Sequence, residues 1–190
     1  MRYASINEYE VANGISNGIS LYVQGCDFHC PGCFNKSAWD FNGGKEWTKE
    51  TEEDFLKLID RPYIKRVSIL GGEPLASQNL DGVLNLVNQI RLSLPEKSIW
   101  LYTGFVIEDI GFCKAMSDFA KGEIDWETAL NTEYDNLLRN MIVSKVDVLV
   151  DGRFEDDKKD LSLQFRGSSN QRIILVRESL EQGEIILWNN

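Results

Sequence analysis

The sequence predicts an α/β fold with mainly parallel strands, on three observations. Short apolar runs typical of buried strands alternate with longer segments whose apolar residues follow helical spacing. A strand, a crossover helix and a second strand in succession make parallel pairing the expected arrangement. The length of 190 residues, with 43% hydrophobic and 26% charged residues, fits one globular domain over residues 1–190.

The expected strands are short apolar runs that end at glycine or polar residues. Several of them are continuously apolar, as strands covered on both faces of a parallel sheet tend to be. These runs cover residues 19–24, 67–70, 99–102, 146–150, 173–176 and 185–188.

Helical spacing of apolar residues marks the segments between these runs. Thr48 can cap a helix that runs to about Asp60 and has its apolar residues on one side. Residues 76–94 carry apolar side chains at a helical period, and Pro95 ends that segment. Residues 106–141 are expected to be mostly helical, with a break near residues 121–122.

Polar and glycine-rich turns follow four of the expected strands. Functional loops of parallel α/β proteins gather at the carboxyl ends of the strands. We therefore expect these turns to share one rim of the molecule. They are residues 25–26, 71–74, 103–104 and 151–152.

The charge balance and hydropathy exclude some classes of function. The 20 basic and 30 acidic residues give a net charge of −10, and an acidic surface repels the phosphates of nucleic acids. No stretch approaches the ~18 apolar residues of a membrane span. The first ten residues lack the apolar core of a signal peptide. The sequence therefore predicts a cytoplasmic protein that binds neither nucleic acid nor membrane.

Three of the four cysteines lie within eight residues, in the pattern C-x₃-C-x₂-C. A short loop can wrap the thiolates of Cys26, Cys30 and Cys33 around one iron–sulfur cube. Three ligands on a four-iron cube leave one iron open, and an open metal position is typical of a catalytic site. Pro31 and Gly32 suit the tight turn between the last two cysteines.

Two other interpretations of the cysteines remain open at this point. A zinc site usually pairs two short hooks of Cys or His ligands, but the fourth cysteine, Cys113, is about eighty residues away. Cys30 and Cys33 would form a redox dithiol in a thioredoxin-like fold, which leaves Cys26 without a role. Cys113 is expected to be a small buried hydrophobe, and His29, the only histidine, an exposed loop residue.

The cysteine pattern, combined with Gly71-Gly72-Glu73-Pro74 at a second strand end, resembles the radical S-adenosylmethionine (SAM) enzymes. A narrower resemblance is to the activating proteins of anaerobic (class III) ribonucleoside-triphosphate reductases. Gly32 favours this narrower family, because many radical SAM families have an aromatic residue just before the third cysteine. The resemblance rests on the segments SLYVQGC, CPGCFN, WDFNGG, LGGEPL, WLYTG, VLVDG and FRGSSNQ, which are spread over most of the chain.

This resemblance implies a partial (β/α)₆ barrel that is open on one side. It implies that Cys26, Cys30 and Cys33 are the catalytic and metal-binding residues, holding a [4Fe-4S] cluster that cleaves SAM reductively to a 5′-deoxyadenosyl radical. The radical would abstract hydrogen from a backbone glycine of the partner, the large subunit of anaerobic ribonucleoside-triphosphate reductase. A low-potential electron donor such as flavodoxin would supply the electron.

The resemblance also implies a SAM site at the strand ends. The glycines of the second turn would let the backbone approach the ligand closely, Glu73 would hold the SAM ammonium group, and Pro74 would stiffen the turn. Phe34 would pack on the adenine or belong to the core. Thr103 and Asp151 would bond the ribose or the carboxylate, or else shape turns. The expected cofactor-binding set is Gly32, Cys33, Phe34, Gly71, Gly72, Glu73, Pro74, Thr103 and Asp151.

Three rival functions follow from the same residues. One is the activation of another glycyl-radical enzyme, such as pyruvate formate-lyase, although those activases tend to be longer. A second is a small radical SAM enzyme that acts on a free metabolite, which needs pocket-building sequence that is scarce here. A third, from a different class, is a zinc or dithiol interaction module.

Overall fold

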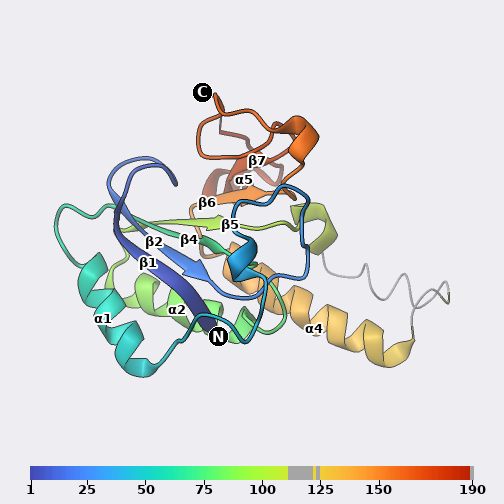
Figure 1. Cartoon of the computed structure of the whole chain (residues 1–190), viewed down its shortest axis with the longest axis horizontal. Coiled ribbons are helices and arrows are strands. Elements are labelled where there is room, and N and C mark those ends of the chain that lie inside the picture. The colour runs from blue at the N-terminus through green and yellow to red at the C-terminus, as the bar shows by residue number, and fades with distance from the viewer. Residues whose placement is uncertain (111–121, 123–124, 189–190) are drawn as a thin grey trace.

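A computed structural model of the chain describes residues 1–110, 122 and 125–188. Within these residues, seven strands form one open sheet in the order β3-β1-β2-β4-β5-β6-β7 (Figure 1). The strands are β1 (Arg2–Glu10), β2 (Gly18–Val23), β3 (Lys45–Glu46), β4 (Arg66–Gly71), β5 (Ser98–Tyr102), β6 (Val148–Asp151) and β7 (Arg172–Leu175). The helices are α1 (Lys49–Ile59), α2 (Leu80–Ser93), α4 (Trp126–Val143) and α5 (Val176–Gln182), with short 3₁₀ turns η1 (Lys36–Ala38), η2 (Ile107–Ile110) and η3 (Asp156–Lys158).

The centre of the sheet is parallel. β2 pairs with β4, β4 with β5 and β5 with β6 in parallel register, whereas β1 and β7 run antiparallel to their neighbours. The prediction of an α/β fold with an open, mainly parallel sheet is confirmed. Parallel pairing brings the C-terminal ends of the four central strands to one edge, and that edge carries the site described below.

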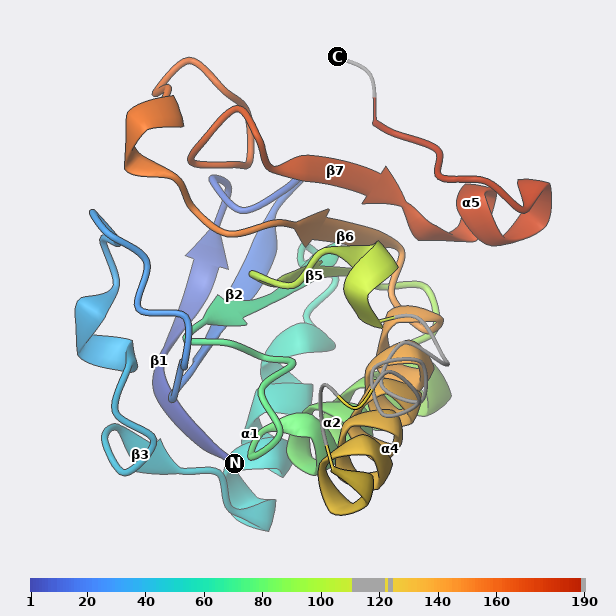
Figure 2. The same cartoon turned by 90° about the vertical axis from the view of Figure 1, so that its right-hand side faces the viewer.

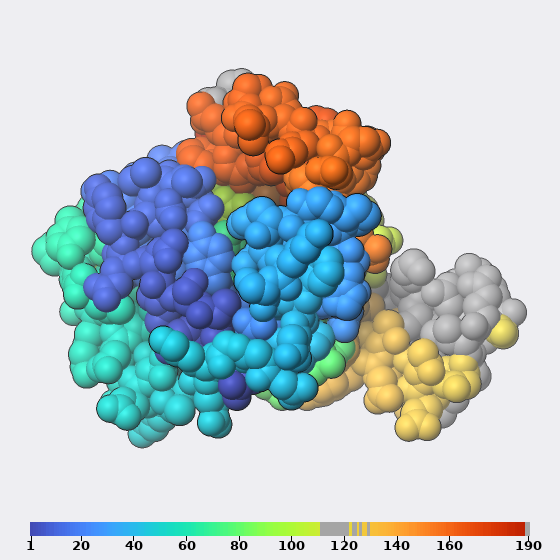
Figure 3. Space-filling view, viewed as in Figure 1, coloured from blue at the N-terminus to red at the C-terminus, as the bar shows by residue number. Residues whose placement is uncertain are grey.

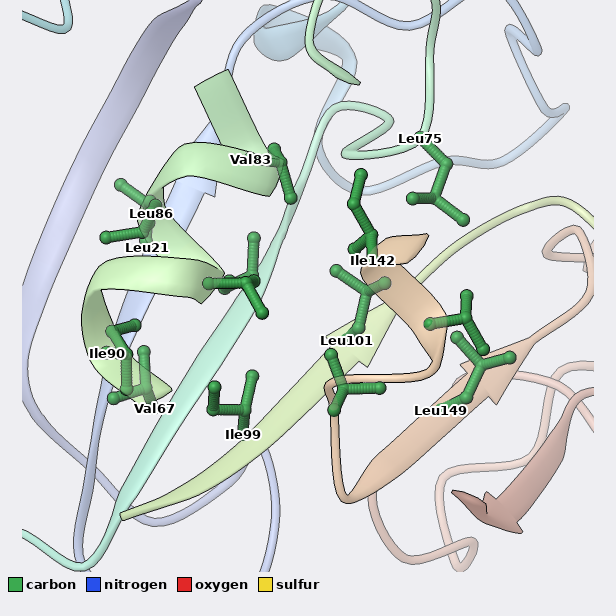
Figure 4. Close-up of a cluster of buried hydrophobic side chains, with 14 of the residues drawn as sticks. Leu21, Val67, Leu75, Val83, Leu86, Ile90, Ile99, Leu101, Ile142 and Leu149 are labelled. Carbon is green, nitrogen blue, oxygen red and sulfur yellow. The ribbon is translucent and has the colours of Figure 1, made fainter. Parts of the chain in front are cut away.

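Helices α1, α2 and α4 cover one face of the sheet (Figure 2). Alternate residues of the central strands point into this layer, and each fully buried aliphatic side chain contributes ~1.5–3 kcal/mol. Thr48 caps α1, as predicted, because its side chain accepts a hydrogen bond from the Thr51 amide. The core between the sheet and helices includes Leu21, Val67, Val83, Leu86, Ile90, Ile99, Leu101, Ile142 and Leu149 (Figure 4).

The opposite face of the sheet holds a buried cation that the sequence analysis did not single out. Arg66, at the start of β4, is fully buried. Its guanidinium donates to the backbone carbonyls of Glu10 (2.7 Å), Ile15 (3.2 Å) and Asn13. Gly14 (φ +131°) must be glycine, since its Cβ would lie 2.7 Å from Arg66 Cδ. Arg66 thus holds the β1–β2 connection across the sheet, at the end opposite to the site.

The strand predictions are confirmed for the buried centre of the sheet and fail at its margins. β1 and β3 were missed because their residues are mostly half-exposed or exposed and do not form an apolar run. β7 is antiparallel because a short 3₁₀ turn, rather than a crossover helix, connects it to β6. Residues 185–188 were predicted as a strand but contribute only a single bridge, between Leu187 and Ile174.

The helix predictions need one correction, at the start of the second helix. The second helix begins at Leu80 rather than near residue 76, because residues 73–79 form successive turns in which Ala76 donates to Glu73 and Asn79 to Ala76. In the region 106–141, the structure describes η2 and α4, and Gly122 at the predicted break has φ +74°. Residues 111–121 and 123–124, with Cys113, lie outside the described residues. Among the helices that are described, none has the length and hydrophobicity to span a bilayer.

Candidate functional site

The three clustered cysteines lie on the loop that follows β2, at the C-terminal edge of the parallel strands. Two backbone hydrogen bonds fold η1 back beside the first cysteine: Gly25 donates to the Ala38 carbonyl (2.8 Å), and Cys26 donates to the Trp39 carbonyl (3.0 Å). All three cysteines are free thiols of intermediate exposure. The loop is therefore ordered by its own backbone while its three cysteines stay partly exposed.

Residues with left-handed backbone bend this loop between the cysteines. His29 has φ 47° and Gly32 has φ 72°, and the Cys33 amide donates to the Cys30 carbonyl across the tight turn (3.1 Å). A Cβ on Gly32 would lie 2.4 Å from a carboxylate oxygen of Asp156. Glycine at this position thus lets the cysteine loop pack against the segment after β6, which adjoins it on the surface (Figure 3).

The surroundings of the thiols fit an anionic metal centre. Burial raises the pKa of the Cys26 thiol and that of the Cys30 thiol, so a bound metal would have to displace their protons. Backbone amides oppose this effect and lower the thiol pKa through hydrogen bonds: those of Phe28 and His29 at Cys26, and that of Phe154 at Cys30. The same amides would be donors to the bound thiolates.

In the part of the chain that the structure describes, no three Cys, His, Asp or Glu side chains converge as the ligands of a single ion would. The assignment of Cys26, Cys30 and Cys33 to an iron–sulfur cube therefore rests on their C-x₃-C-x₂-C pattern and on the amides beside two of them.

The two glycines after β4 are packed against neighbouring backbone. Gly71 has φ +112°, and a Cβ there would lie 2.7 Å from the Tyr22 Cα atom. A Cβ on Gly72 would lie 2.3 Å from the Gly25 carbonyl oxygen and 3.0 Å from that of Ala38. The sequence analysis assigned both glycines to close approach of a ligand. In this structure, the contacts that require glycine come from β2 and the cysteine loop.

Replacing Gly72 by alanine is expected to destabilise the metal-free protein by about 2 kcal/mol, because the new methyl group must displace rigid backbone. For a chain of this length, each kcal/mol of lost stability lowers the midpoint temperature of unfolding by roughly 2–4 °C. Thermal unfolding of the metal-free wild type and variant measures this decrease in the midpoint temperature. Gly82→Ala is the matched control, since only the side chain of Met1 approaches that position. Equal midpoints for the two variants would contradict this packing role.

Glu73 ties the ends of β4 and β5 together. Its carboxylate accepts hydrogen bonds from the Thr103 hydroxyl (2.7 Å) and from the amides of Leu75 (2.8 Å) and Gly104 (2.7 Å). Complete burial raises the pKa of Glu73 to about 7, although these three donors and Arg139 oppose the increase. The predicted binding residues Glu73 and Thr103 are thus brought together, and both already have partners within the protein.

Asp151, at the end of β6, is engaged in an ion pair. Arg172 Nε donates to its Oδ1 atom (2.9 Å), and the Ile107 amide donates to its Oδ2 atom (3.0 Å). Arg172 also bonds the Glu108 carboxylate through both terminal nitrogens. Asp151 therefore organises the turns after β5 and β6 instead of standing free to meet a ligand.

A pocket of about 910 Å³ opens between the cysteine loop, the turns after β5 and β6, and α4. This volume is at the upper end of what small-molecule sites have. On its wall the Phe28 and Phe105 rings meet edge to face, 4.9 Å apart. The Arg153 guanidinium lies 4.3 Å from the Phe28 ring centroid, and that of Arg139 lies 4.4 Å from Phe105. These contacts join the cysteine loop to the turns after β5 and β6, and the turn after β5 to α4.

Comparison with known proteins agrees with this arrangement. The family described as the 4Fe-4S single cluster domain matches residues 12–174. A relative from Escherichia coli K12 named anaerobic ribonucleoside-triphosphate reductase-activating protein is 35% identical over 179 residues, which are 93% of this chain and 100% of the relative. The chain belongs to the family of anaerobic ribonucleoside-triphosphate reductase-activating proteins. Proteins of the same name from Vibrio cholerae (33% identity; 91% of this chain, 97% of the relative) and Enterobacteria phage T4 (31%; 91% and 93%) agree.

Phe34 and Pro74 are the two remaining residues that the sequence of this activating protein predicts to bind the cofactor. Phe34 is 88% exposed, so the prediction that it belongs to the core is wrong, and its contact with adenine stays a prediction. Pro74 is buried in the turn after Glu73, where its fixed φ angle restricts the backbone.

Several residues around the site were missed by the sequence analysis. Asn79 donates to the carbonyls of Gln24 (3.0 Å) and Glu73 (2.9 Å) and so bridges the ends of β2 and β4. Arg153 and Asn170 line the pocket, and the buried Oδ1 atom of Asn170 has no hydrogen-bond partner among the described residues. The signals available in the sequence were that Arg153 follows a predicted strand and that Asn170 lies in the segment RGSSNQ. Neither residue belongs to a recognisable metal-binding or catalytic motif.

Proposed function

We propose that this protein activates an anaerobic ribonucleoside-triphosphate reductase by generating a radical on a backbone glycine of its large subunit. The observation that carries the proposal is the C-x₃-C-x₂-C loop beside a pocket of about 910 Å³, in a chain that aligns with the full length of a relative bearing that name. We also propose that residues 1–190 act as one domain, because β1 and β7 belong to the same sheet.

Cys26, Cys30 and Cys33 would hold the [4Fe-4S] cluster and leave its fourth iron open to SAM. When bound, the reduced cluster would supply one electron to the SAM sulfonium; the sulfur–5′-carbon bond would break, methionine would leave, and the 5′-deoxyadenosyl fragment would take a hydrogen atom from the partner glycine. The amides beside Cys26 and Cys30 support this assignment, since they are donors to thiolates. A low-potential donor such as flavodoxin is proposed as the electron source.

The pocket wall would bind and orient SAM. Arg153 is exposed beside Cys30, is held over the Phe28 ring, and has no ion pair among the described residues. Its guanidinium would pair with the SAM carboxylate. The unpartnered Oδ1 atom of Asn170 would accept a hydrogen bond from the ribose or the adenine amino group. Glu73 is buried and does not line this pocket, but it keeps one lone pair beyond its three hydrogen bonds, with which it would face the SAM ammonium group from the turn after β4.

The test is activation of the reductase from the same organism. The protein is reconstituted with iron and sulfide without oxygen, reduced, and mixed with SAM and the reductase large subunit. We expect an electron paramagnetic resonance (EPR) signal of a glycyl radical on the reductase only when SAM is present. A radical formed on pyruvate formate-lyase but not on the reductase would support the other activase function. Zinc without iron in the purified protein would overturn the proposal.

A further inference from the structure

The residue after Phe34 has an unusual combination of contacts. Asn35 follows the third cysteine by two positions, and its backbone amide lies 3.4 Å from the Cys33 sulfur as a hydrogen-bond donor. The amide nitrogen of its side chain, Nδ2, is buried and has no hydrogen-bond partner among the described residues. A buried donor without an acceptor is costly, and such a group in a functional region calls for a partner.

Local structure does not account for this side chain. Asn35 is the N-cap residue of η1, and its backbone carbonyl accepts from the Ala38 amide (3.0 Å). Asparagine is favoured at such positions because its side-chain oxygen accepts a hydrogen bond from the first turn. Here the side chain makes no capping bond. The amide is therefore free of the structural task that asparagine usually has at this position.

The backbone around Asn35 is fixed relative to the cysteines. Ala38 at the end of η1 accepts from Gly25, and the following residue, Trp39, accepts from Cys26. The turn that Asn35 begins is thus tied to the first cysteine, while the Asn35 amide contacts the sulfur of the third. Both ends of the cysteine loop therefore fix where the Asn35 backbone lies, which keeps its side chain near Cys33.

We propose that Asn35 Nδ2 donates a hydrogen bond to a sulfur of the bound iron–sulfur cluster, either the Cys33 thiolate or an inorganic sulfide. This inference rests on the proposed function. The acceptor it needs is anionic sulfur, which the cluster supplies beside Cys33. Reduction adds one negative charge to the cluster, so a fixed donor favours the reduced form and raises the midpoint potential. Asn35 is then a positioning residue that makes the one-electron reduction easier.

The test is an EPR-monitored redox titration of the reconstituted protein without partner, which requires no activity. Asn35→Ala is expected to weaken the preference for the reduced cluster at least tenfold, and tenfold for one electron is 59 mV to more negative potential. Asn35→Asp keeps the shape and the capping ability of the side chain but replaces the donor by a carboxylate. We expect it to lower the potential at least as far as the alanine variant does.

Asn42→Ala is the matched control, because Asn42 is an exposed asparagine of the next turn. Its potential should equal that of the wild type. A midpoint potential unchanged in Asn35→Asp would overturn the inference, even if the alanine variant were altered, since a structural or water-binding role is retained by aspartate. If the potential of Asn35→Asp were unchanged but SAM still changed the EPR signal of the wild type, the proposed function would stand and only the role of Asn35 would be rejected. A wild-type chain that binds no cluster would overturn both.

Discussion

Replacing Cys30 by alanine is expected to abolish cluster binding and, with it, all glycyl-radical formation. A four-iron cube held by three protein thiolates retains only two after this change, and the Phe154 and Cys33 amides that surround Cys30 cannot replace a sulfur ligand. Iron in the reconstituted protein should fall from about four atoms per chain to background. Iron and sulfide analysis, with EPR of the reduced sample, measures the loss.

Cys113→Ala is the matched control for this experiment. Cys113 is outside the C-x₃-C-x₂-C pattern, so iron content and the effect of SAM on the EPR signal should match those of the wild type. Loss of the cluster in Cys113→Ala would mean that all four irons have cysteine ligands. The open iron that SAM binding requires would then be missing, and the proposed mechanism would fail. A Cys30→Ala protein that keeps its cluster would contradict the ligand assignment itself.

The sequence was sufficient to predict those parts of the fold that are buried on both faces. β2, β4, β5 and β6 are mostly apolar and mostly buried, because helices cover one side of the sheet and other segments cover the opposite side. β1 escaped prediction because an edge region with mostly half-exposed residues needs no apolar run. Arg66 escaped because a buried cation that bonds backbone carbonyls leaves no pattern in the residues around it.

For the site, the sequence predicted which strand ends meet but not which atoms bond each other. The turns at residues 25–26, 71–74, 103–104 and 151–152 do share one edge, because parallel register requires it. Asp151 was expected to be available for a ligand, yet its partner Arg172 is 21 positions further along the chain. Such pairs depend on the antiparallel return of β7, which the residues between them do not specify.

A second large effect is expected in the pH dependence of stability, and it comes from Glu73. Burial raises the pKa of Glu73 to about 7 in the folded protein, whereas an unfolded glutamate titrates near 4.3. Between these two values, the folded state holds a proton that the unfolded state has lost. Stability from this group is therefore full below about pH 4 and is lost as pH rises through 7. The full loss, over the whole range, amounts to about 4 kcal/mol.

The glutamine variant isolates this contribution. Glu73→Gln cannot titrate, so the stability difference between wild type and variant should fall by about 2–3 kcal/mol from pH 5 to pH 8, as the wild type loses its protonated carboxyl. The variant should be less stable than the wild type at pH 5. At that pH its amide presents NH₂ where a carboxylic acid can still accept from the Gly104 or Leu75 amide. Denaturant unfolding of the metal-free protein at both pH values gives the difference.

Glu184→Gln, at an exposed position, controls for the loss of one carboxylate from a chain whose net charge is already −10. If the difference in stability between wild type and Glu73→Gln is the same at pH 5 and pH 8, Glu73 is already ionised in the folded protein at pH 5. In that case the hydrogen bonds from Thr103, Gly104 and Leu75 lower the pKa of Glu73 by more than burial raises it. The carboxylate would then be a permanent negative charge beside Cys26, positioned to attract the cationic end of SAM. A falling difference would instead mean that Glu73 is mostly neutral at pH 5 and gains this charge only as the pH approaches 7.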